Sequence, residues 1–277
     1  HSFPTRRSSD LAFQPKDTKR LIAAALGNVE NDLAIEGCRI FNVFTKEFLE
    51  ATVYICDGFI SHVEYNKKNS ALPSKQRLQL NGILCPGFID AHTHIESSLL
   101  VPEHYAAMVL PHGTTTVLED AHEIANVMGV EGIQYMLAAS QDLPMRMLLT
   151  LPSCVPSLPG FESSNAELFA KDYTALFQHP RVAGLGEVMD YEGVLQGEQR
   201  IHDLLLAAKK HAGYLQGHAP LMEGNRLSAY VNAGPQSDHE VKTKQEALDK
   251  YRKGMWIDIR EANTQGRMKE ILDVCKE

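Results

Sequence analysis

Hydrophobic and polar positions follow two different rhythms, and the first occupies the N-terminal third of the chain. Three segments there carry β-branched and aromatic residues in partial alternation with polar ones: Asp32–Ile40, Ala51–Cys56 and Phe59–Tyr65. A period of two predicts strands with one buried face. Turn-forming residues at 45–47 and at Asp57-Gly58 separate them. Asp17–Gly27 is predicted as a short helix between an N-cap and a C-terminal glycine. Residues 12–83 are therefore predicted to form a helix and a small β-sandwich-like domain.

From residue 84 onward, short apolar runs alternate with helical stretches of about 10–15 residues, as in βα units. The predicted strands are Leu84–Asp90, Thr114–Glu119, Met145–Leu151, Val182–Glu187, Tyr214–His218, Gln236–Asp238 and Met255–Ile259. The predicted helices between them include Pro102–Val109, Val130–Ala139, Leu168–Phe177, Arg200–Ala212, Arg226–Ala233 and Lys244–Lys253.

Seven consecutive βα units predict an α/β fold, a TIM-like (β/α)₈ barrel that is incomplete over residues 84–277. The alternative is a doubly wound open sheet, which requires a glycine-rich phosphate-binding turn after its first strand. Here the first strand leads into His92-Thr93-His94 instead.

Composition narrows the functional classes. The chain of 277 residues has 27 Lys and Arg against 35 Asp and Glu, a net charge of −8. This acidity argues against nucleic-acid binding, and no apolar run is long enough to cross a membrane. Five widely spaced cysteines, with no CxxC pair, favour a reducing cytoplasm over a disulfide framework. Residues 1–11 contain no apolar signal region and are expected to be a non-native or disordered segment.

Five of the twelve histidines lie at or just after predicted strand ends, where barrel enzymes carry their reactive groups. They are His92, His94, His122, His218 and His239. His92 and His94 point to the same side of a strand, because residues two apart share a face. The acids Glu119, Asp120, Glu187, Asp238 and Glu240 stand at the same ends. Mixed imidazole and carboxylate ligands suit zinc, iron or manganese, and such ions activate water for hydrolysis.

Several blocks of sequence carry a family resemblance. They are PGFIDAHTHIESS (86–98), HGTTTVLEDAHEIANVMG (112–129), PSCVPS (152–157), GLGEVM (184–189), GHAP (217–220), SDHE (237–240) and MWIDIRE (255–261). In this order they resemble the amidohydrolase superfamily and, within it, the bacterial adenine deaminase family. The resemblance extends from about residue 21 to the end of the chain.

The resemblance implies hydrolytic deamination of adenine to hypoxanthine and ammonia by metal-activated water, a step of purine salvage, with two divalent metal ions (Mn, Fe or Zn). By the family pattern, His92, His94, Glu187, His218 and His239 would bind metal, with Glu187 as the bridge. Glu187, His239 and Glu240 would be catalytic. The resemblance also places Glu96, Asp120 and His122 as candidates for substrate binding. A homo-oligomer is left open.

The sequence also departs from the family. Glu119-Asp120-Ala121-His122 stands where relatives have Ala-Asp-Pro-His, and Arg260-Glu261-Ala262 replaces Arg-Glu-Gly. The barrel region is shorter than the roughly 250 residues of a complete barrel, and the aspartate after strand eight is missing. We therefore expect a truncated sequence with little activity of its own. Two alternatives are another cyclic amidohydrolase, acting on a ring amide or imide, and a non-catalytic scaffold on the same fold.

Overall fold

The computed structural model describes residues 18–65, 71–211, 213–260 and 268–273. These fall into two compact units that divide between Gly87 and Phe88, and each unit is described by itself. The segment 1–11, the N-cap Asp17 and the departures at Glu261 and Ala262 lie outside the described residues.

The N-terminal unit is built on a five-stranded sheet in the order β3-β2-β1-β4, with β5 also pairing with β1. The strands are β1 (Asn31–Asn42), β2 (Glu47–Cys56), β3 (Phe59–Tyr65), β4 (Ser74–Gln79) and β5 (Ile83–Leu84). β1, β2 and β3 are antiparallel neighbours and contain the three predicted strands, whereas β4 and β5 run parallel to β1. In the residues described, this unit has one sheet, with α1 (Thr18–Ala25) against β2 and β3, rather than two sheets packed face to face.

The turn between β2 and β3 has the geometry that its residues predict. Asp57 and Gly58 have φ values of 53° and 76°, both in the left-handed region. Asp-Gly is one of the pairs that best tolerates this geometry, and the resulting turn matches the twist of the two flanking strands.

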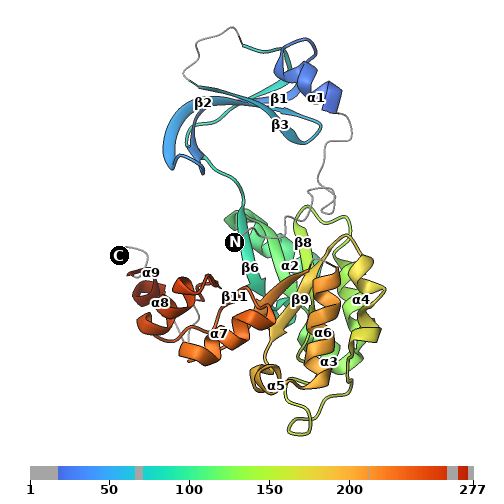
Figure 1. Ribbon diagram of the computed structural model, residues 1–277. Coiled ribbons are helices and arrows are strands. Elements are labelled where there is room, and N and C mark those ends of the chain that lie inside the picture. Colours follow the sequence, from blue (N-terminus) through green and yellow to red (C-terminus); the bar gives the residue numbers. More distant parts are fainter. Residues whose placement is uncertain (1–17, 66–70, 212, 261–267, 274–277) are drawn as a thin grey trace. The chain divides into compact units, whose positions relative to one another are not determined.

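The second unit is an incomplete barrel. Seven parallel strands lie side by side in chain order, and the sheet curls with helices on its outer side (Figure 1). The strands are β6 (Phe88–Thr93), β7 (Thr114–Asp120), β8 (Arg146–Pro152), β9 (Val182–Val188), β10 (Tyr214–Gly217), β11 (Ser237–Asp238) and β12 (Trp256–Ile257). This confirms the predicted fold class. Among the described residues, β6 and β12 each have a neighbour on one side only.

Helices and 3₁₀ turns connect these strands. The helices are α2 (Pro102–Val109), α3 (His122–Met128), α4 (Val130–Ala139), α5 (Tyr191–Gln196), α6 (Gln199–Lys210), α7 (Gly224–Ala233), α8 (Lys244–Arg252) and α9 (Met268–Leu272). The 3₁₀ turns are η2 (Ile95–Ser98), η3 (Leu110–His112), η4 (Ala170–Tyr173) and η5 (Leu176–Gln178). Among the described residues no helix is both long and apolar enough to cross a bilayer.

Two predicted elements were wrong in detail. The predicted strand Leu84–Asp90 is two strands, because Pro86, which has no backbone N–H, lies between β5 and β6. The predicted helix Leu168–Phe177 is replaced by η4 and η5. There, Asp172 accepts the backbone N–H of Phe169 at 2.8 Å, and the hydroxyl of the buried Tyr173 donates to the Pro152 carbonyl at 2.7 Å. These bonds fix a tighter local path than an α-helix.

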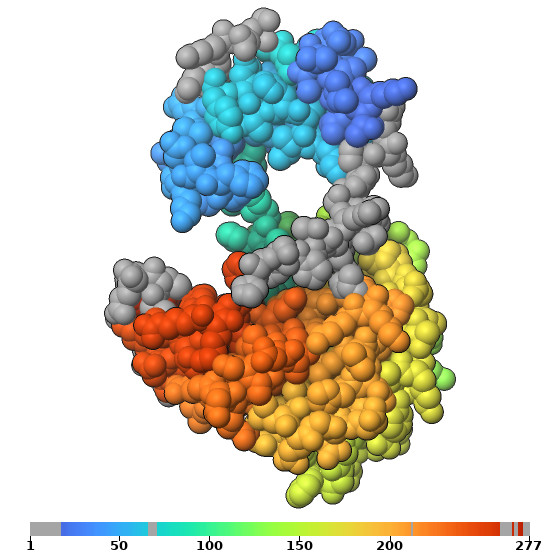
Figure 2. All heavy atoms as spheres, in the orientation of Figure 1, coloured from blue at the N-terminus to red at the C-terminus, as the bar shows by residue number. Residues whose placement is uncertain are grey.

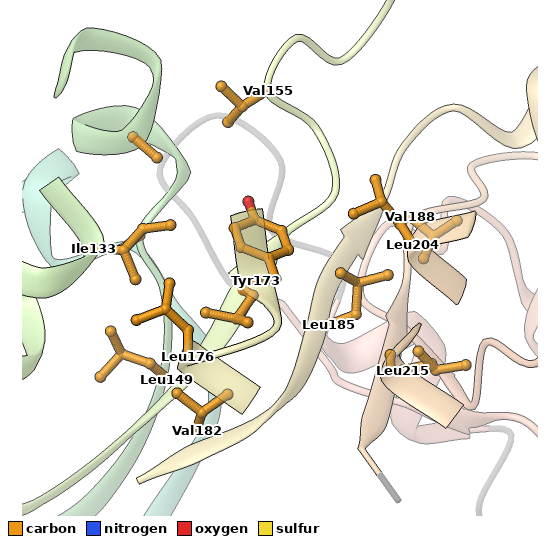
Figure 3. Close-up of a cluster of buried hydrophobic side chains, with 14 of the residues drawn as sticks. Ile133, Leu149, Val155, Tyr173, Leu176, Val182, Leu185, Val188, Leu204 and Leu215 are labelled. Atoms are coloured by element: carbon orange, nitrogen blue, oxygen red, sulfur yellow. The ribbon is translucent and has the colours of Figure 1, made fainter. Parts of the chain in front are cut away.

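The core of the barrel unit lies between the sheet and its helices (Figure 3). Every residue of β9 is buried, as expected for a parallel strand covered on both faces. α6 contributes the buried residues Ile201, Leu204, Leu205 and Ala208, whose spacing forms one apolar stripe. In the space-filling view, the orange spheres of α6 and α7 cover the sheet on the face shown (Figure 2).

Candidate metal centre

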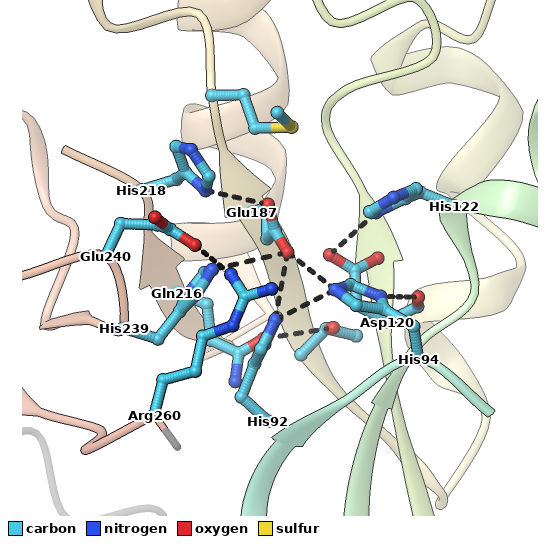
Figure 4. A network of polar contacts seen from close by, with 12 residues as sticks. His92, His94, Asp120, His122, Glu187, Gln216, His218, His239, Glu240 and Arg260 are labelled. Carbon is cyan, nitrogen blue, oxygen red and sulfur yellow. Dashed lines mark hydrogen bonds and ion pairs between the residues drawn. The ribbon is translucent and has the colours of Figure 1, made fainter. Parts of the chain in front are cut away.

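The Glu187 carboxylate, near the end of β9, is the centre of the polar cluster in the barrel mouth (Figure 4). Its Oε1 lies 2.9 Å from His92 Nε2 and 2.8 Å from His94 Nε2. Its Oε2 lies 2.9 Å from His218 Nδ1, and His239 Nε2 is 3.5 Å from Oε1. Side chains from β6, β9 and the segments after β10 and β11 therefore converge on one carboxylate.

Hydrogen bonds to Nδ1 of His92 and of His94 orient the two rings, so that Nε2 of each ring faces Glu187. Gln216 donates its amide to the Ala91 carbonyl at 2.7 Å, so its Oε1 is left to accept from His92 Nδ1 at 3.2 Å. His94 Nδ1 lies 2.9 Å from the Asp120 carbonyl oxygen, which can only accept. Both Nδ1 atoms are therefore donors, and both Nε2 atoms carry a lone pair when the rings are neutral.

Lone pairs consequently converge in the centre. His92 Nε2 and His94 Nε2 are 3.0 Å apart, and each lies within 3 Å of Glu187 Oε1. When both rings are neutral, three acceptors at these distances repel one another unless a positive charge, from a proton or a metal ion, lies among them. The side chain of Glu187 is only 3% exposed, so water cannot screen the charge. The donor set thus fits divalent metal ions, which bind neutral imidazole and carboxylate.

The charges of the cluster's own residues favour positive charge beside Glu187. Burial favours the neutral carboxyl, but contacts with His218, His92 and His94 outweigh it and hold the pKa of Glu187 far below its usual range. Burial opposes a charged His94, yet Glu187 and Asp120 raise the pKa of this ring to about 9. Burial, followed by the charge of His92, lowers the pKa of His239 to about 3. The anionic carboxylate therefore attracts positive charge into the cluster.

Glu240 closes one side of the cluster. A carboxylate oxygen of Glu240, His218 and His239 offer ligand atoms within 4.8 Å of one another. Lys242 and Arg260 form ion pairs with the two oxygens of Glu240. Its carboxylate is thus held beside the two histidines by basic side chains on its outer side.

A buried ion triad supports the two segments that carry His218 and His239. Lys250 of α8, completely buried, forms ion pairs with Asp238 and Glu246 and donates to the Ala219 carbonyl at 2.7 Å. Asp238 in turn accepts the backbone N–H of Ala219 at 3.0 Å. One ammonium group therefore ties the segment after β10 to the segment after β11.

Gln216 and Lys250 were not among the predicted site residues. Gln216 lies two residues before His218, and alternation along a strand could have placed it on the same face. Lys250 is on α8, whose other lysine, Lys244, is exposed, and nothing in the sequence singles Lys250 out.

A cavity of about 980 Å³ opens beside the metal candidates, lined among others by His92, His94, His239, Asp258 and Arg260. The three predicted substrate-binding residues are not among its lining residues. Glu96 accepts the Ile124 N–H at 3.2 Å. Asp120 is completely buried, and His122 lies against His94, with ring centroids 4.4 Å apart. The structure thus places these three side chains behind the cluster, and their contact with substrate stays a prediction.

Comparison with known proteins identifies the family. Residues 83–277 match the profile of the Amidohydrolase family, which is more than half of the chain. The chain belongs to the amidohydrolase family.

Solved structures agree on the fold. A triazine hydrolase variant superposes with a TM-score of 0.58 at 15% identity, covering 89% of this amidohydrolase and 70% of that chain. An N-acyl-D-glutamate deacylase from Bordetella bronchiseptica, complexed with zinc and a phosphonate inhibitor, gives a TM-score of 0.54 at 13% identity, covering 83% and 58%.

Closer relatives are curated as adenine deaminases. The protein of Methanothrix thermoacetophila is 40% identical over 257 residues, which is 93% of this amidohydrolase and 44% of the relative. That of Dehalococcoides mccartyi is 42% identical over 254 residues, or 91% and 43%. This amidohydrolase therefore spans less than half the length of the curated relatives that it matches.

Proposed function

We propose that this chain is the metal-binding part of a hydrolase that deaminates adenine to hypoxanthine and ammonia. The observation that carries the proposal is the convergence of His92, His94 and His218 on the buried carboxylate of Glu187. Identities of 38–42% to proteins named adenine deaminase support adenine as the substrate.

In this proposal the cluster would hold two divalent ions. His92 and His94 would hold one ion, His218 and His239 would hold the other, and Glu187 would be shared between them. When bound, such ions polarise an electrophile and lower the pKa of a coordinated water. Manganese, iron and zinc all accept this ligand set.

The chain's own residues orient this centre. Gln216 fixes the ring of His92 and the Asp120 carbonyl fixes that of His94, so both Nε2 atoms face inward. Lys250 holds together the segments of His218 and His239. Glu240, set beside His218 and His239, is the carboxylate that we assign to proton transfer between water and the departing amine. Water supplies the oxygen of hypoxanthine, and the C6–N bond breaks to release ammonia.

Because relatives are longer, the test uses a chimera as well as the chain itself. Residues 18–260 would replace the matching segment of the Methanothrix protein. Ammonia release would be measured with adenine, adenosine and cytosine, and ring opening of dihydrouracil, which releases no ammonia, would be followed by chromatography. We expect turnover of adenine alone in the Mn²⁺-loaded chimera, and little from the 277-residue chain. Glu187→Gln should abolish turnover, whereas Glu192→Gln, an exposed glutamate on α5, should not.

The same assay distinguishes the alternatives. A folded, metal-loaded chimera that hydrolyses dihydrouracil instead would identify a cyclic amidohydrolase acting on ring amides. A chimera that binds metal yet turns over none of the four compounds would favour a non-catalytic scaffold.

A further inference from the structure

A second group of potential metal ligands adjoins the Glu187 cluster and shares with it His122, whose ring also lies within 4.8 Å of ligand atoms of His94 and Glu187. It consists of Asp120 at the end of β7, His122 at the start of α3 and Cys154 after β8. One ligand atom from each lies within 4.8 Å of the others. Figure 4 shows Asp120 and His122 side by side, with His122 on the far side of Asp120 from His92.

The Asp120 carboxylate is the feature of this group that needs explanation. Asp120 is completely buried, and neither carboxylate oxygen has a hydrogen-bond partner. His122 Nδ1 is 3.7 Å from Oδ2, beyond hydrogen-bond length, and it too lacks a partner. A buried carboxylate without compensation costs several kcal/mol. Asp120 and His122 form an ion pair that is too long for a hydrogen bond, the buried Cys154 lies within ligand distance of both, and a bound cation would contact all three.

Space for the carboxylate is built into the neighbouring strand. Gly186 of β9 lies against Asp120, and a Cβ atom at this position would come within 2.8 Å of Asp120 Oδ2 and 2.2 Å of Thr150 Oγ1. Any larger residue at 186 would push the carboxylate away.

We propose that Asp120, His122 and Cys154 form a further divalent-cation site, distinct from the Glu187 cluster. One carboxylate oxygen, one imidazole nitrogen and one thiolate sulfur are the ligands of zinc or ferrous iron, with water free to complete the coordination. Sulfur sets this site apart, because the Glu187 cluster offers only nitrogen and oxygen. The site is also coupled to that cluster, since the Asp120 carbonyl contacts His94.

Another group with a cysteine lies in the N-terminal unit and consists of Asp32, Cys56 and Asp57. The pairing of its carboxylates excludes it as a metal site. Arg20 forms ion pairs with Asp32 and Asp57, and Lys75 also pairs with Asp32 at 2.8 Å. Side-chain cations already neutralise these carboxylates, so they hold no place for a metal ion.

Cobalt titration of the metal-free 277-residue chain tests the proposal without relying on turnover. Co²⁺ bound to thiolate gives an intense near-ultraviolet charge-transfer band, whereas Co²⁺ on nitrogen and oxygen ligands gives only weak visible bands. We expect the charge-transfer band in the wild-type chain and three Co²⁺ per chain at saturation.

Variants then assign the band. Cys154→Ser should remove it and lower the stoichiometry by one, while the visible bands of the Glu187 cluster stay. Asp120→Asn should weaken the Co²⁺ affinity read from the band by at least the roughly 10–100-fold that loss of a supporting residue costs. Cys38→Ser and Cys56→Ser, at buried cysteines of the N-terminal unit, should leave it unchanged.

Absence of the band in the wild-type chain at saturating Co²⁺, or its persistence in Cys154→Ser, would overturn the proposal. The wild-type spectrum decides the matter even where a variant fails to fold. Failure of the adenine assay would leave this result untouched, because the band reports sulfur ligation alone.

Discussion

Asp32 in the N-terminal unit and Glu187 in the barrel unit are both carboxylates at the centre of a polar cluster, but they are neutralised differently. The side chain of Asp32 is 35% exposed and is paired with Arg20 and Lys75. The side chain of Glu187 is 3% exposed and meets imidazoles only. A surface carboxylate is thus satisfied by the chain itself, whereas the buried one is surrounded by groups that become good ligands when neutral. The comparison therefore indicates that the Glu187 cluster, unlike the Asp32 cluster, is suited to bind a metal ion.

Removing the bridging carboxylate should have the largest effect. Glu187→Gln should reduce the binding of metal ions to the cluster to one or none, because the amide carries no charge. Wild-type protein with Mn²⁺ at about 1,000 times its dissociation constant should gain about 4 kcal/mol of stability. Thermal unfolding with and without chelator should show this gain in the wild type and its loss in the variant. An equal chelator effect in both would mean that Glu187 binds no metal.

Removing the charge of Lys250 from the buried ion triad should have the next largest effect. Lys250→Met leaves Asp238 and Glu246 buried without their cation, and breaking such a pair costs about 3–5 kcal/mol. Urea unfolding measures the loss. Lys253→Met, at the residue that follows α8 and paired with Asp249 in a more exposed position, is the matched control and should cost about 0.3–0.5 kcal/mol. Similar losses in the two variants would contradict the assigned role of burial.

Removing the Gln216 side-chain amide should have an intermediate effect, which is on metal affinity. Gln216→Ala frees the ring of His92 to rotate, and loss of such a partner weakens metal binding about 10–100-fold. Competition with a chromophoric chelator would report the affinity. The exposed Gln199 of α6, changed to alanine, should bind metal as the wild type does; an unchanged affinity in Gln216→Ala would refute the orienting role.

Asp32→Asn should have the smallest effect, below about 1 kcal/mol at pH 7, because exposed ion pairs contribute little. Hydrogen bonds from Lys75 and Arg20 lower the pKa of Asp32 from 3.8. Any stability that it adds is therefore present above pH 3.8 and is lost as the pH falls through the lower folded value. Urea unfolding at pH 7 and pH 3 should show the difference between variant and wild type shrinking in acid. A difference that grows in acid would have the wrong sign.

The sequence predicted the order of the strands and the side chains that meet around Glu187, for a physical reason; that these side chains bind metal stays a prediction. The strands of a parallel barrel are short runs of apolar residues that can be recognised in the sequence. The end of each run therefore identifies the residues that reach the active-site face of the barrel. His92, His94, Glu187, His218 and His239 all stand at or near such ends, so one rule finds all five.

Other features could not be found in this way. β4 contains a single apolar residue, Leu78, and its pairing with β1 depends on residues far away in sequence. The burial of Lys250 depends on Asp238 and Ala219 from other elements. The position of Asp120 behind the cluster, rather than at its surface, is set by the packing of β7 against β8 and β9. Such contacts are tertiary, and no local pattern encodes them.

Strand order in the barrel unit has a consequence for how the chain folds. Each strand from β7 to β12 pairs with the one made just before it, so the sheet can grow in the direction of synthesis without waiting for distant segments. The segments that connect successive strands contain the helices and 3₁₀ turns, and pairing with the preceding strand closes a smaller loop than pairing with a more distant strand would. Amide protons of the fully buried β9 should exchange last, and those of the two outer strands first. The Glu187 ligands arrive with β6, β9 and the segments after β10 and β11, so the cluster is completed only when most of this sheet has formed.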